Sequence, residues 1–365
     1  MNIIYALFKL LKTEEKVVMI SRQSNEVNDD FKLLGKELEN SGMKVVYLCR
    51  TLDGGVNSTL FTKVMYGFHM FTQMYHLATS KVCVLDTYCL VVSILKHKKA
   101  LQVVQIWHTV GKLKQFGWQI IGKGEGSSET IATVMKMHEN YDVIYCAGEE
   151  YKQVLMEGFR APAEKFRIFT LPRIDLLTDE NYINSTREKI FAKYPVLKEK
   201  PNVVYAPTFR KKEDEFEKYL KEFINAFNFE KYNLIVKLHP LSKTVVADER
   251  VIMDNEFSTF QMFTCTDKLV SDYSCVVYEA GIKGIPLYFY NYDMNTYENV
   301  RGLAIDYNVL PGYKEQNAKK LVESFEKPYD YEYLNSYIRL HIENIKDCTR
   351  KMAADIISLS HNQSS

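Results

Sequence analysis

The stretch LQVVQIWHTVGKLK, residues 101–114, contains both the strand pattern that decides the fold and the residues of a candidate site. Its apolar, β-branched part at 101–107 is typical of a buried strand, and a basic loop follows it. Working outward, similar short runs occur at 16–20, 44–48, 81–85 and 141–147, and amphipathic segments lie between most of them. Strands that alternate with helices predict a parallel sheet covered by helices.

A second series of the same kind follows in the C-terminal half. Strand-like runs occur at 202–206, 234–238, 251–253, 268–270 and 285–290, with a helical pattern at 215–227. Because 365 residues at about 150 per domain correspond to two domains, we predict two α/β domains. The polar, proline-interrupted stretch at 171–201 places the boundary, which gives domains at 1–172 and 173–365. The amphipathic pattern at 333–359 predicts one long last helix, free to pack back across the junction.

The overall charge and the cysteines exclude several classes of protein. Lysine and arginine number 47 against 46 acids, so no global field favours nucleic acid, and any basic site must be local. The seven cysteines form no C-x-x-C pair and are typical of reduced thiols in a cytosolic protein. No apolar run approaches the roughly 18 residues that a bilayer span needs. We therefore expect a protein that is neither exported nor integral to a membrane.

Two segments have the composition of a membrane-contacting surface. Residues 1–12 place five apolar side chains at helical spacing, with two lysines and no acid. Residues 60–77 carry an aromatic and apolar stripe, with Lys63 as the single charge. A helix packed on the first sheet explains the second stripe as well as insertion into a membrane interface does, and the two roles can occupy different faces.

His108 is the first candidate catalytic residue. It lies where the strand at 101–107 ends, and ligands of open α/β sheets bind at the carboxyl ends of strands. A histidine there can accept a proton near neutral pH, and the following Lys112 and Lys114 indicate an anionic substrate. The alternative is a histidine that merely caps a strand.

Other polar residues also follow predicted strands. His239, in the K-L-H-P segment at 237–240, follows the strand at 234–238. Ser271, Asp272 and Ser274 lie between the strand at 268–270 and an apolar helix, where free backbone N–H groups form a phosphate cradle. Glu279 lies further along that helix, within reach of ribose hydroxyls. The structural alternatives are a polar strand end, a serine N-cap and an exposed helical glutamate.

Two arginines complete the set. Arg210 and Arg301 each lie in a loop after a strand, and arginine forks suit phosphate oxygens. Singly, each is more typical of a surface ion pair. Because all these residues follow strand ends in both domains, they predict one interdomain cleft for an anionic ligand. No motif calls for a metal or another cofactor.

With these residues the chain resembles the CDP-glycerol glycerophosphotransferase family of teichoic acid synthesis. Five family motifs occur in the family's order: W-H-x-x-x-x-L-K at 107–114, Y-A-P-T-F-R at 205–210, K-L-H-P at 237–240, S-D-Y-S at 271–274 and Y-x-x-x-R-G at 297–302. Cys275 stands where the family usually has a second serine. The length and wording look most like the primase branch.

The resemblance implies two Rossmann-like domains of the GT-B type, with the donor nucleotide in the C-terminal domain and the acceptor on the N-terminal one. It implies that His108 is the general base, and that His239, Ser274, Arg301 and Arg210 hold the donor diphosphate. The implied reaction transfers glycerol phosphate from CDP-glycerol to an undecaprenyl-diphosphate-linked ManNAc-GlcNAc disaccharide and releases CMP, without a cofactor.

The implied location is the cytoplasmic face of the bacterial membrane, where the protein is peripheral and contacts an anionic lipid surface and other teichoic acid enzymes. Three alternatives remain open at this point: a polymerase of glycerol or ribitol phosphate, a nucleotide-sugar glycosyltransferase of the same fold, and a non-catalytic membrane scaffold.

Overall fold

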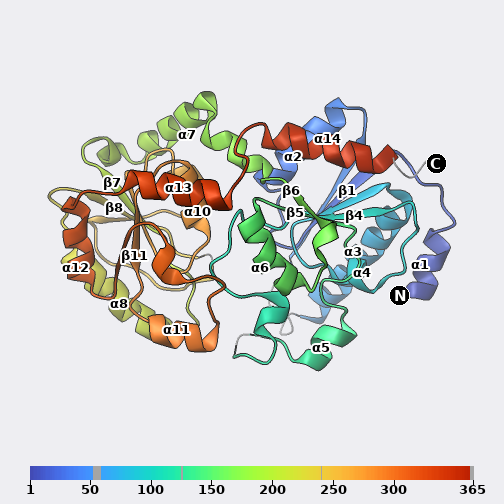
Figure 1. The fold of residues 1–365 in the computed structure, drawn as a ribbon, viewed down its shortest axis with the longest axis horizontal. Coiled ribbons are helices and arrows are strands. Elements are labelled where there is room, and N and C mark those ends of the chain that lie inside the picture. Colours follow the sequence, from blue (N-terminus) through green and yellow to red (C-terminus); the bar gives the residue numbers. More distant parts are fainter. Residues whose placement is uncertain (52–58, 125, 240, 362–365) are drawn as a thin grey trace. The chain divides into compact units, whose positions relative to one another are not determined.

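A computed structural model describes residues 1–51, 59–124, 126–239 and 241–361. The chain divides into two compact units (Figure 1). Unit 1 comprises Met1–Val110, Phe116–Asp175 and Ile342–Ser365, and unit 2 comprises Gly111–Gln115 and Leu176–His341. The expected ranges were 1–172 and 173–365, and the main division in the structure falls between Asp175 and Leu176. In addition, Gly111–Gln115 from the N-terminal half belongs to unit 2, and Ile342–Ser365 from the C-terminal half belongs to unit 1.

Unit 1 is built on a six-stranded, fully parallel sheet of order β2-β1-β3-β4-β5-β6. The strands are β1 (Lys16–Ser21), β2 (Lys44–Cys49), β3 (Val82–Leu85), β4 (Gln102–Gln105), β5 (Val143–Cys146) and β6 (Phe166–Ile168). The helices are α1 (Asn2–Phe8), α2 (Asp29–Asn40), α3 (Leu60–Thr79), α4 (Leu90–Ile94), α5 (Glu129–Val134), α6 (Glu149–Phe159) and α14 (Cys348–His361). Every residue of β1, β3 and β5 is buried, as helices on both faces of a parallel sheet require.

Unit 2 repeats this architecture with the order β12-β11-β10-β7-β8-β9. The strands are β7 (Asn202–Tyr205), β8 (Asn233–Val236), β9 (Val251–Met253), β10 (Lys268–Ser271), β11 (Leu287–Tyr290) and β12 (Tyr313–Glu315). The helices are α7 (Glu180–Lys193), α8 (Glu213–Ala226), α9 (Thr259–Met262), α10 (Val276–Ile282), α11 (Met294–Val300), α12 (Ala318–Glu323) and α13 (Tyr331–His341). Short 3₁₀ helices occur in both units: η2 (Gly117–Ile120) and η3 (Ala163–Lys165) in unit 1, η4 (Pro172–Leu177) at the division, and η5 (Pro195–Lys198), η6 (Tyr307–Val309) and η7 (Ser324–Glu326) in unit 2.

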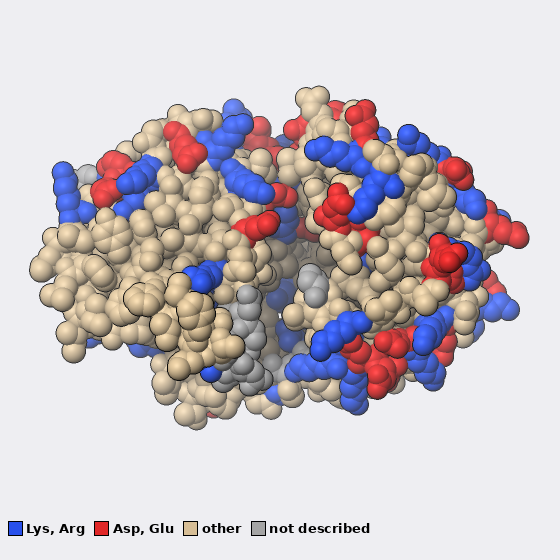
Figure 2. Space-filling model, turned by 180° about the vertical axis from the view of Figure 1, so that it is seen from behind, with Lys and Arg blue, Asp and Glu red and all other residues tan. Residues whose placement is uncertain are grey.

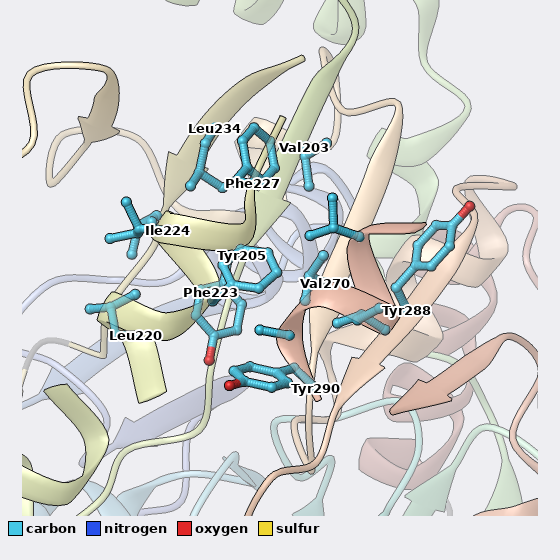
Figure 3. Packing of buried hydrophobic residues seen from close by; sticks show 14 of the residues in the cluster. Val203, Tyr205, Leu220, Phe223, Ile224, Phe227, Leu234, Val270, Tyr288 and Tyr290 are labelled. Atoms are coloured by element: carbon cyan, nitrogen blue, oxygen red, sulfur yellow. The ribbon is translucent and has the colours of Figure 1, made fainter. Parts of the chain in front are cut away.

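Aromatic side chains fill the core of unit 2 between the sheet and α8. Tyr205 on β7 packs against Phe223 on α8 with ring centroids 4.8 Å apart, and Phe223 lies 5.6 Å from Tyr290 on β11 (Figure 3). All three side chains are fully buried. Because rings of this size carry much of the hydrophobic stabilisation of a core, they fix β7 and β11 relative to α8. The loops at the carboxyl ends of these strands are thereby held in place.

The predicted α/β fold with two parallel sheets is confirmed, and the predicted strands are present in both units. β6 and β12 were not predicted, because their three-residue segments, FRI and YKE, include charged side chains and form no continuous apolar run. The strand predicted at 101–107 ends earlier, at Gln105, because Trp107 adopts a left-handed backbone with φ 55°. The single helix predicted at 333–359 is wrong. The chain forms α13 and α14 instead, Asp347 between them is also left-handed, and the two helices belong to different units.

Candidate active site

His108 lies just beyond β4 in unit 1, and its ring is held in one tautomer. Its Nδ1 lies 3.0 Å from the backbone oxygen of Asp86, which follows β3. A carbonyl oxygen can only accept, so Nδ1 carries the proton and Nε2 keeps its lone pair. This is the form that a general base requires.

The backbone around His108 is fixed from two sides. The amide of the left-handed Trp107 donates to Oε1 of Gln105 at 2.9 Å. The Arg173 guanidinium donates to the backbone oxygen of His108 at 3.0 Å and forms an ion pair with Asp30, a buried residue of α2. Neither Arg173 nor Asp30 was predicted, because only the folded chain brings η4 and α2 to the end of β4.

Asp86 is the other unpredicted residue here. Its carboxylate is buried, and burial raises the pKa of this group to about 6 even though Asn28 donates to it at 2.8 Å. Its place directly after the strand at 81–85 was the signal that could have revealed it. Asp86 therefore holds His108 through its backbone oxygen, while its side chain ties the β3 end to the start of α2.

His239 of unit 2 has the opposite tautomer. It lies beyond β8, and its Nδ1 accepts a hydrogen bond from the backbone N–H of Leu241 at 3.2 Å. Because an amide N–H can only donate, Nδ1 is unprotonated and the neutral ring carries its proton on Nε2. Burial lowers the pKa of His239, and the positive charge of Lys114 lowers it further. A neutral His239 thus offers one N–H donor at Nε2. Pro240 of the same motif lies outside the described residues.

Lys112 and Lys114 belong to unit 2, with the predicted donor residues. Their segment pairs with the loop after Arg301: Gln115 N–H donates to Gly302 O at 3.1 Å, and Ala304 N–H donates to Leu113 O at 2.8 Å. Gly111 lets the same segment pass close to α10, because a Cβ there would lie 2.3 Å from the ring of Tyr278. The structure therefore joins both lysines to the loop that carries Arg301.

This arrangement concentrates positive charge. Burial is the main cause that lowers the pKa of Lys112 to about 7, and the charges of Lys114 and Arg301 contribute to this value. Burial also lowers the pKa of Lys114, and Arg301 adds to this effect. On the molecular face drawn in Figure 2, basic and acidic side chains are interspersed. Like charges that depress one another's pKa form a site where an anion is stabilised.

The S-D-Y-S segment is mostly structural. Ser271 is buried and its hydroxyl donates to Ala206 O at 2.7 Å. The buried Asp272 accepts from the backbone N–H of Thr208 at 2.9 Å and from its hydroxyl at 2.7 Å. Ser274 is half-buried. The N-cap of α10 is Cys275, which forms no side-chain cap, so Ser274 is not the N-cap.

Glu279 lies further along α10. Its side chain is buried rather than exposed.

Arg210 is held mainly by protein groups. Its Nε donates to Asp293 at 2.7 Å, and its Nη2 donates to Asp272 at 2.9 Å and to Asp293 at 3.1 Å. Its Nη1 donates to Thr208 O at 2.7 Å. Four of its five N–H groups therefore have protein acceptors, which makes Arg210 a residue that orders the loops after β7, β10 and β11. Its expected contact with the donor diphosphate stays a prediction.

The predicted residues thus fall into two sets. His108 lies in unit 1, whereas Lys112, Lys114, His239, Ser274 and Arg301 lie in unit 2. Across the described ranges, no group of three or more His, Cys, Asp or Glu side chains is placed to hold a metal ion. That the reaction needs no cofactor stays a prediction.

Comparison with known proteins agrees with this geometry. Residues 3–346 match the family model described as CDP-Glycerol:Poly(glycerophosphate) glycerophosphotransferase. The chain belongs to this glycerophosphotransferase family. The resemblance seen in the sequence motifs is confirmed, and the protein is a transferase.

Curated relatives of this glycerophosphotransferase include both primases and polymerases. The teichoic acid ribitol-phosphate primase of Bacillus spizizenii is 26% identical over 94% of this chain and 91% of its own length. The teichoic acid glycerol-phosphate primase of Staphylococcus aureus is 28% identical over 82% of this chain and 81% of its own. The poly(ribitol-phosphate) polymerase of B. spizizenii is 27% identical over 97% of this chain, which spans 58% of that polymerase.

Solved structures establish the fold. The wall teichoic acid polymerase TagF aligns with a TM-score of 0.77 at 17% identity, covering 100% of this chain and 94% of the TagF chain. A UDP-GlcNAc 2-epimerase from Neisseria meningitidis aligns with a TM-score of 0.59 at 13% identity, covering 94% of this chain and 100% of its own. The predicted GT-B type, with two Rossmann-like parallel sheets, is confirmed.

Proposed function

We propose that this glycerophosphotransferase is a wall teichoic acid primase. It transfers one glycerol phosphate from CDP-glycerol to an undecaprenyl-diphosphate-linked ManNAc-GlcNAc disaccharide and releases CMP. The observation that carries the proposal is the pair of strand-end histidines with opposite tautomers. His108 presents a lone pair that can accept the proton of the acceptor hydroxyl, and His239 presents an N–H group that can donate to a phosphate oxygen.

In the proposed reaction the acceptor hydroxyl loses its proton to His108 Nε2. Its oxygen forms a bond to the glycerol-bearing phosphorus, and the bond from that phosphorus to the bridging oxygen breaks. The bridging oxygen leaves with CMP and carries the electron pair of the broken bond. Protonated His108 then returns its proton to solvent.

In this proposal the unit 2 residues hold the donor diphosphate. His239 donates from Nε2 and Ser274 from its hydroxyl, while Lys114 and Arg301 supply positive charge near the leaving group. Lys112, whose pKa is lowered to about 7 in the free protein, takes up a proton when the anionic donor binds beside it, because a nearby negative charge raises the pKa of an amine. Fixed donors and charges are worth most where charge develops, because they need no reorganisation during the reaction. Phosphoryl transfer with little covalent chemistry by the protein suits such a site.

The decisive experiment is incubation of the purified protein with radiolabelled CDP-glycerol and a synthetic lipid-disaccharide acceptor. A primase adds one unit, whereas a polymerase gives long products. CDP-ribitol and UDP-sugars are assayed in parallel, which tests the ribitol-phosphate and nucleotide-sugar alternatives. A fully inactive, folded protein would support the scaffold alternative and refute the proposal.

The two histidines give a separable prediction. His108→Ala should lower kcat by about 10²- to 10⁴-fold while CDP-glycerol binding persists, because the base acts on the acceptor. His239→Ala should impair transfer to every acceptor, because the donor is common to all of them. His361→Ala, an exposed histidine of α14, is the matched control. An His108→Ala variant that keeps more than about a tenth of kcat would remove the base assignment.

We also propose that the enzyme is peripheral at the cytoplasmic membrane surface, where a lipid-linked acceptor resides. α1 and α3 pack together in unit 1, with Phe8 against Tyr75 at 6.3 Å. Apolar side chains stay exposed on both, among them Ile3, Leu7, Phe61 and Phe68. Only the C-terminal part of α3 is buried, so the helix contributes both to the core and to this exposed surface. Within the described ranges, no helix has the length and hydropathy needed to cross a membrane.

A further inference from the structure

A cavity of about 790 Å³ lies in unit 2 at the amino ends of β7, β10 and β11. Parts of α7 and η5 complete its wall. These strands are parallel, and Ser274 follows the carboxyl end of β10, so the cavity and the proposed donor site lie at opposite edges of the sheet. A four-residue strand such as β7 is roughly 13 Å long, which separates the two edges. The proposed reaction does not use this cavity.

Positive charge exceeds negative charge in the wall of the cavity. Four cationic side chains and two carboxylates line it, namely Arg187, Lys198, Lys200 and Lys283 against Glu199 and Asp267. Among the residues that the structure describes, no carboxylate forms an ion pair with any of the four cations. The excess of positive charge favours an anionic ligand.

Arg187 of α7 is fixed against the wall by one of its N–H groups. Its Nε donates to the backbone oxygen of Thr264 at 2.6 Å, and the side chain is half-buried. Within the described ranges, Nε is the only guanidinium nitrogen of Arg187 with a protein acceptor. The two Nη groups are therefore available to a ligand, and their planar fork matches the oxygens of a phosphate.

Lys283 places a second cation near Arg187. It follows the last residue of α10, and its amine donates to the backbone oxygen of Leu177 at 3.1 Å. Burial is the main cause that lowers the pKa of Lys283, and the positive charge of Arg187 contributes, while Glu180 opposes the shift. An anion that binds beside both cations relieves the repulsion between them.

The negative groups at this edge of the sheet are largely engaged. Asp267 accepts a hydrogen bond from the backbone N–H of Asn202 at 2.7 Å. Carbonyl oxygens in the last turn of α10 accept from the backbone N–H groups of residues 283–285. Glu199 is exposed, so water and salt screen its charge. These groups therefore oppose an anion in the cavity only weakly.

The cavity is larger than a bare anion needs. Its volume lies within the range of about 300–1,000 Å³ that is usual for small-molecule sites. Phe191, Phe263 and Tyr331 supply aromatic surface to its wall. A planar base packs well on aromatic rings, and a phosphate monoester carries a charge of about −1.5 to −2 at pH 7. A nucleotide combines these two parts in one small molecule.

We propose that this cavity binds a nucleoside monophosphate, with its phosphate held by Arg187 and Lys283 and its base against the aromatic part of the wall. The inference goes beyond the proposed function and does not depend on it. α10 joins the cavity to the proposed donor site, because the helix begins two residues after Ser274 and ends next to Lys283. A ligand bound at Lys283 thus occupies the position of an effector rather than that of a substrate.

The test measures the binding of AMP by calorimetry, because the base of AMP differs from the cytosine of the proposed donor. Arg187→Gln should weaken AMP binding by about tenfold or more, since it removes charge-assisted hydrogen bonds to the phosphate. Arg250→Gln is the matched control, because Arg250 is an exposed arginine of unit 2 outside the cavity wall. Inorganic phosphate and adenosine should each bind more weakly than AMP, because each lacks one of its two parts.

Lys198→Met is a second variant for the case that Arg187→Gln does not fold by circular dichroism. Lys198 is exposed on η5, and its replacement should also weaken AMP binding because it removes positive charge from the wall. Unchanged AMP affinity in the folded variant, adenosine binding as tight as that of AMP, or a parent protein that binds no AMP would overturn the inference.

His239→Ala separates the cavity from the proposed donor site. This variant should bind AMP as the parent does, and a loss of AMP binding in it would assign AMP to the donor site and overturn the inference. A protein that binds AMP through Arg187 but transfers nothing from CDP-glycerol would refute the proposed function alone, so the two failures are distinguishable.

Discussion

Replacing Arg210 by alanine should destabilise unit 2 strongly. The Arg210 side chain is only 11% exposed and bridges the carboxylates of Asp272 and Asp293. The ring centroid of Tyr297 lies 4.8 Å from the guanidinium carbon. Tyr297 stacks in turn on Tyr273 at 3.9 Å. Removing one partner from a buried ion pair typically costs about 3–5 kcal/mol, because a buried charge is left uncompensated.

The remaining contacts of the two carboxylates set the expected value within that range. Asp272 keeps its hydrogen bonds from Thr208 and from the backbone N–H of Tyr273, and Asp293 keeps the one from the Tyr273 hydroxyl. These contacts compensate part of the charge, so we expect a loss near the lower end, about 3 kcal/mol. With a urea m-value of about 2 kcal/mol per molar, the unfolding midpoint should fall by about 1.5 M.

The assay is urea unfolding followed by circular dichroism, with the midpoint and m-value fitted for each transition that the two units show. Arg250→Ala is the matched control: Arg250 also pairs with an aspartate in unit 2, but its side chain is 59% exposed. This variant should unfold close to the parent, because exposed ion pairs contribute little. An Arg210→Ala variant that unfolds at the same urea concentration as Arg250→Ala would refute the assignment of Arg210 as the residue that orders these loops.

Two further predictions concern pH and membranes. Burial depresses the pKa of Lys112 from 10.5 to about 7, so unfolding takes up a proton between these values and the free energy of unfolding should rise with pH there. Lys112→Met should flatten this rise in unfolding measured from pH 7 to 9, and an unchanged slope would contradict the burial argument. Phe68→Ser combined with Phe71→Ser should reduce cosedimentation with phosphatidylglycerol vesicles, because both side chains are exposed on α3. Ile131→Ser with Val134→Ser, also exposed but on α5, is the control, and equal pelleting of both double variants would exclude α3 as the membrane contact.

The sequence alone determined the architecture and the kind of chemistry. Short buried strands and the polar residues at their ends are local features, so a segment of about five to ten residues is enough to predict them. That is why His108 and His239 could be recognised as strand-end histidines, and why the lysines after His108 indicated an anionic substrate. The family motifs are equally local, and they gave the same family as the comparison over residues 3–346.

Tertiary structure decided how those residues are used. Only packing shows that Lys112 and Lys114 join the loop of Arg301 in unit 2, because that pairing links segments almost 190 residues apart. The opposite tautomers of the two histidines follow from single backbone groups, and the role of Arg210 follows from two aspartates distant in sequence. Local patterns encode elements, whereas hydrogen-bond partners and burial depend on contacts that a linear pattern does not contain.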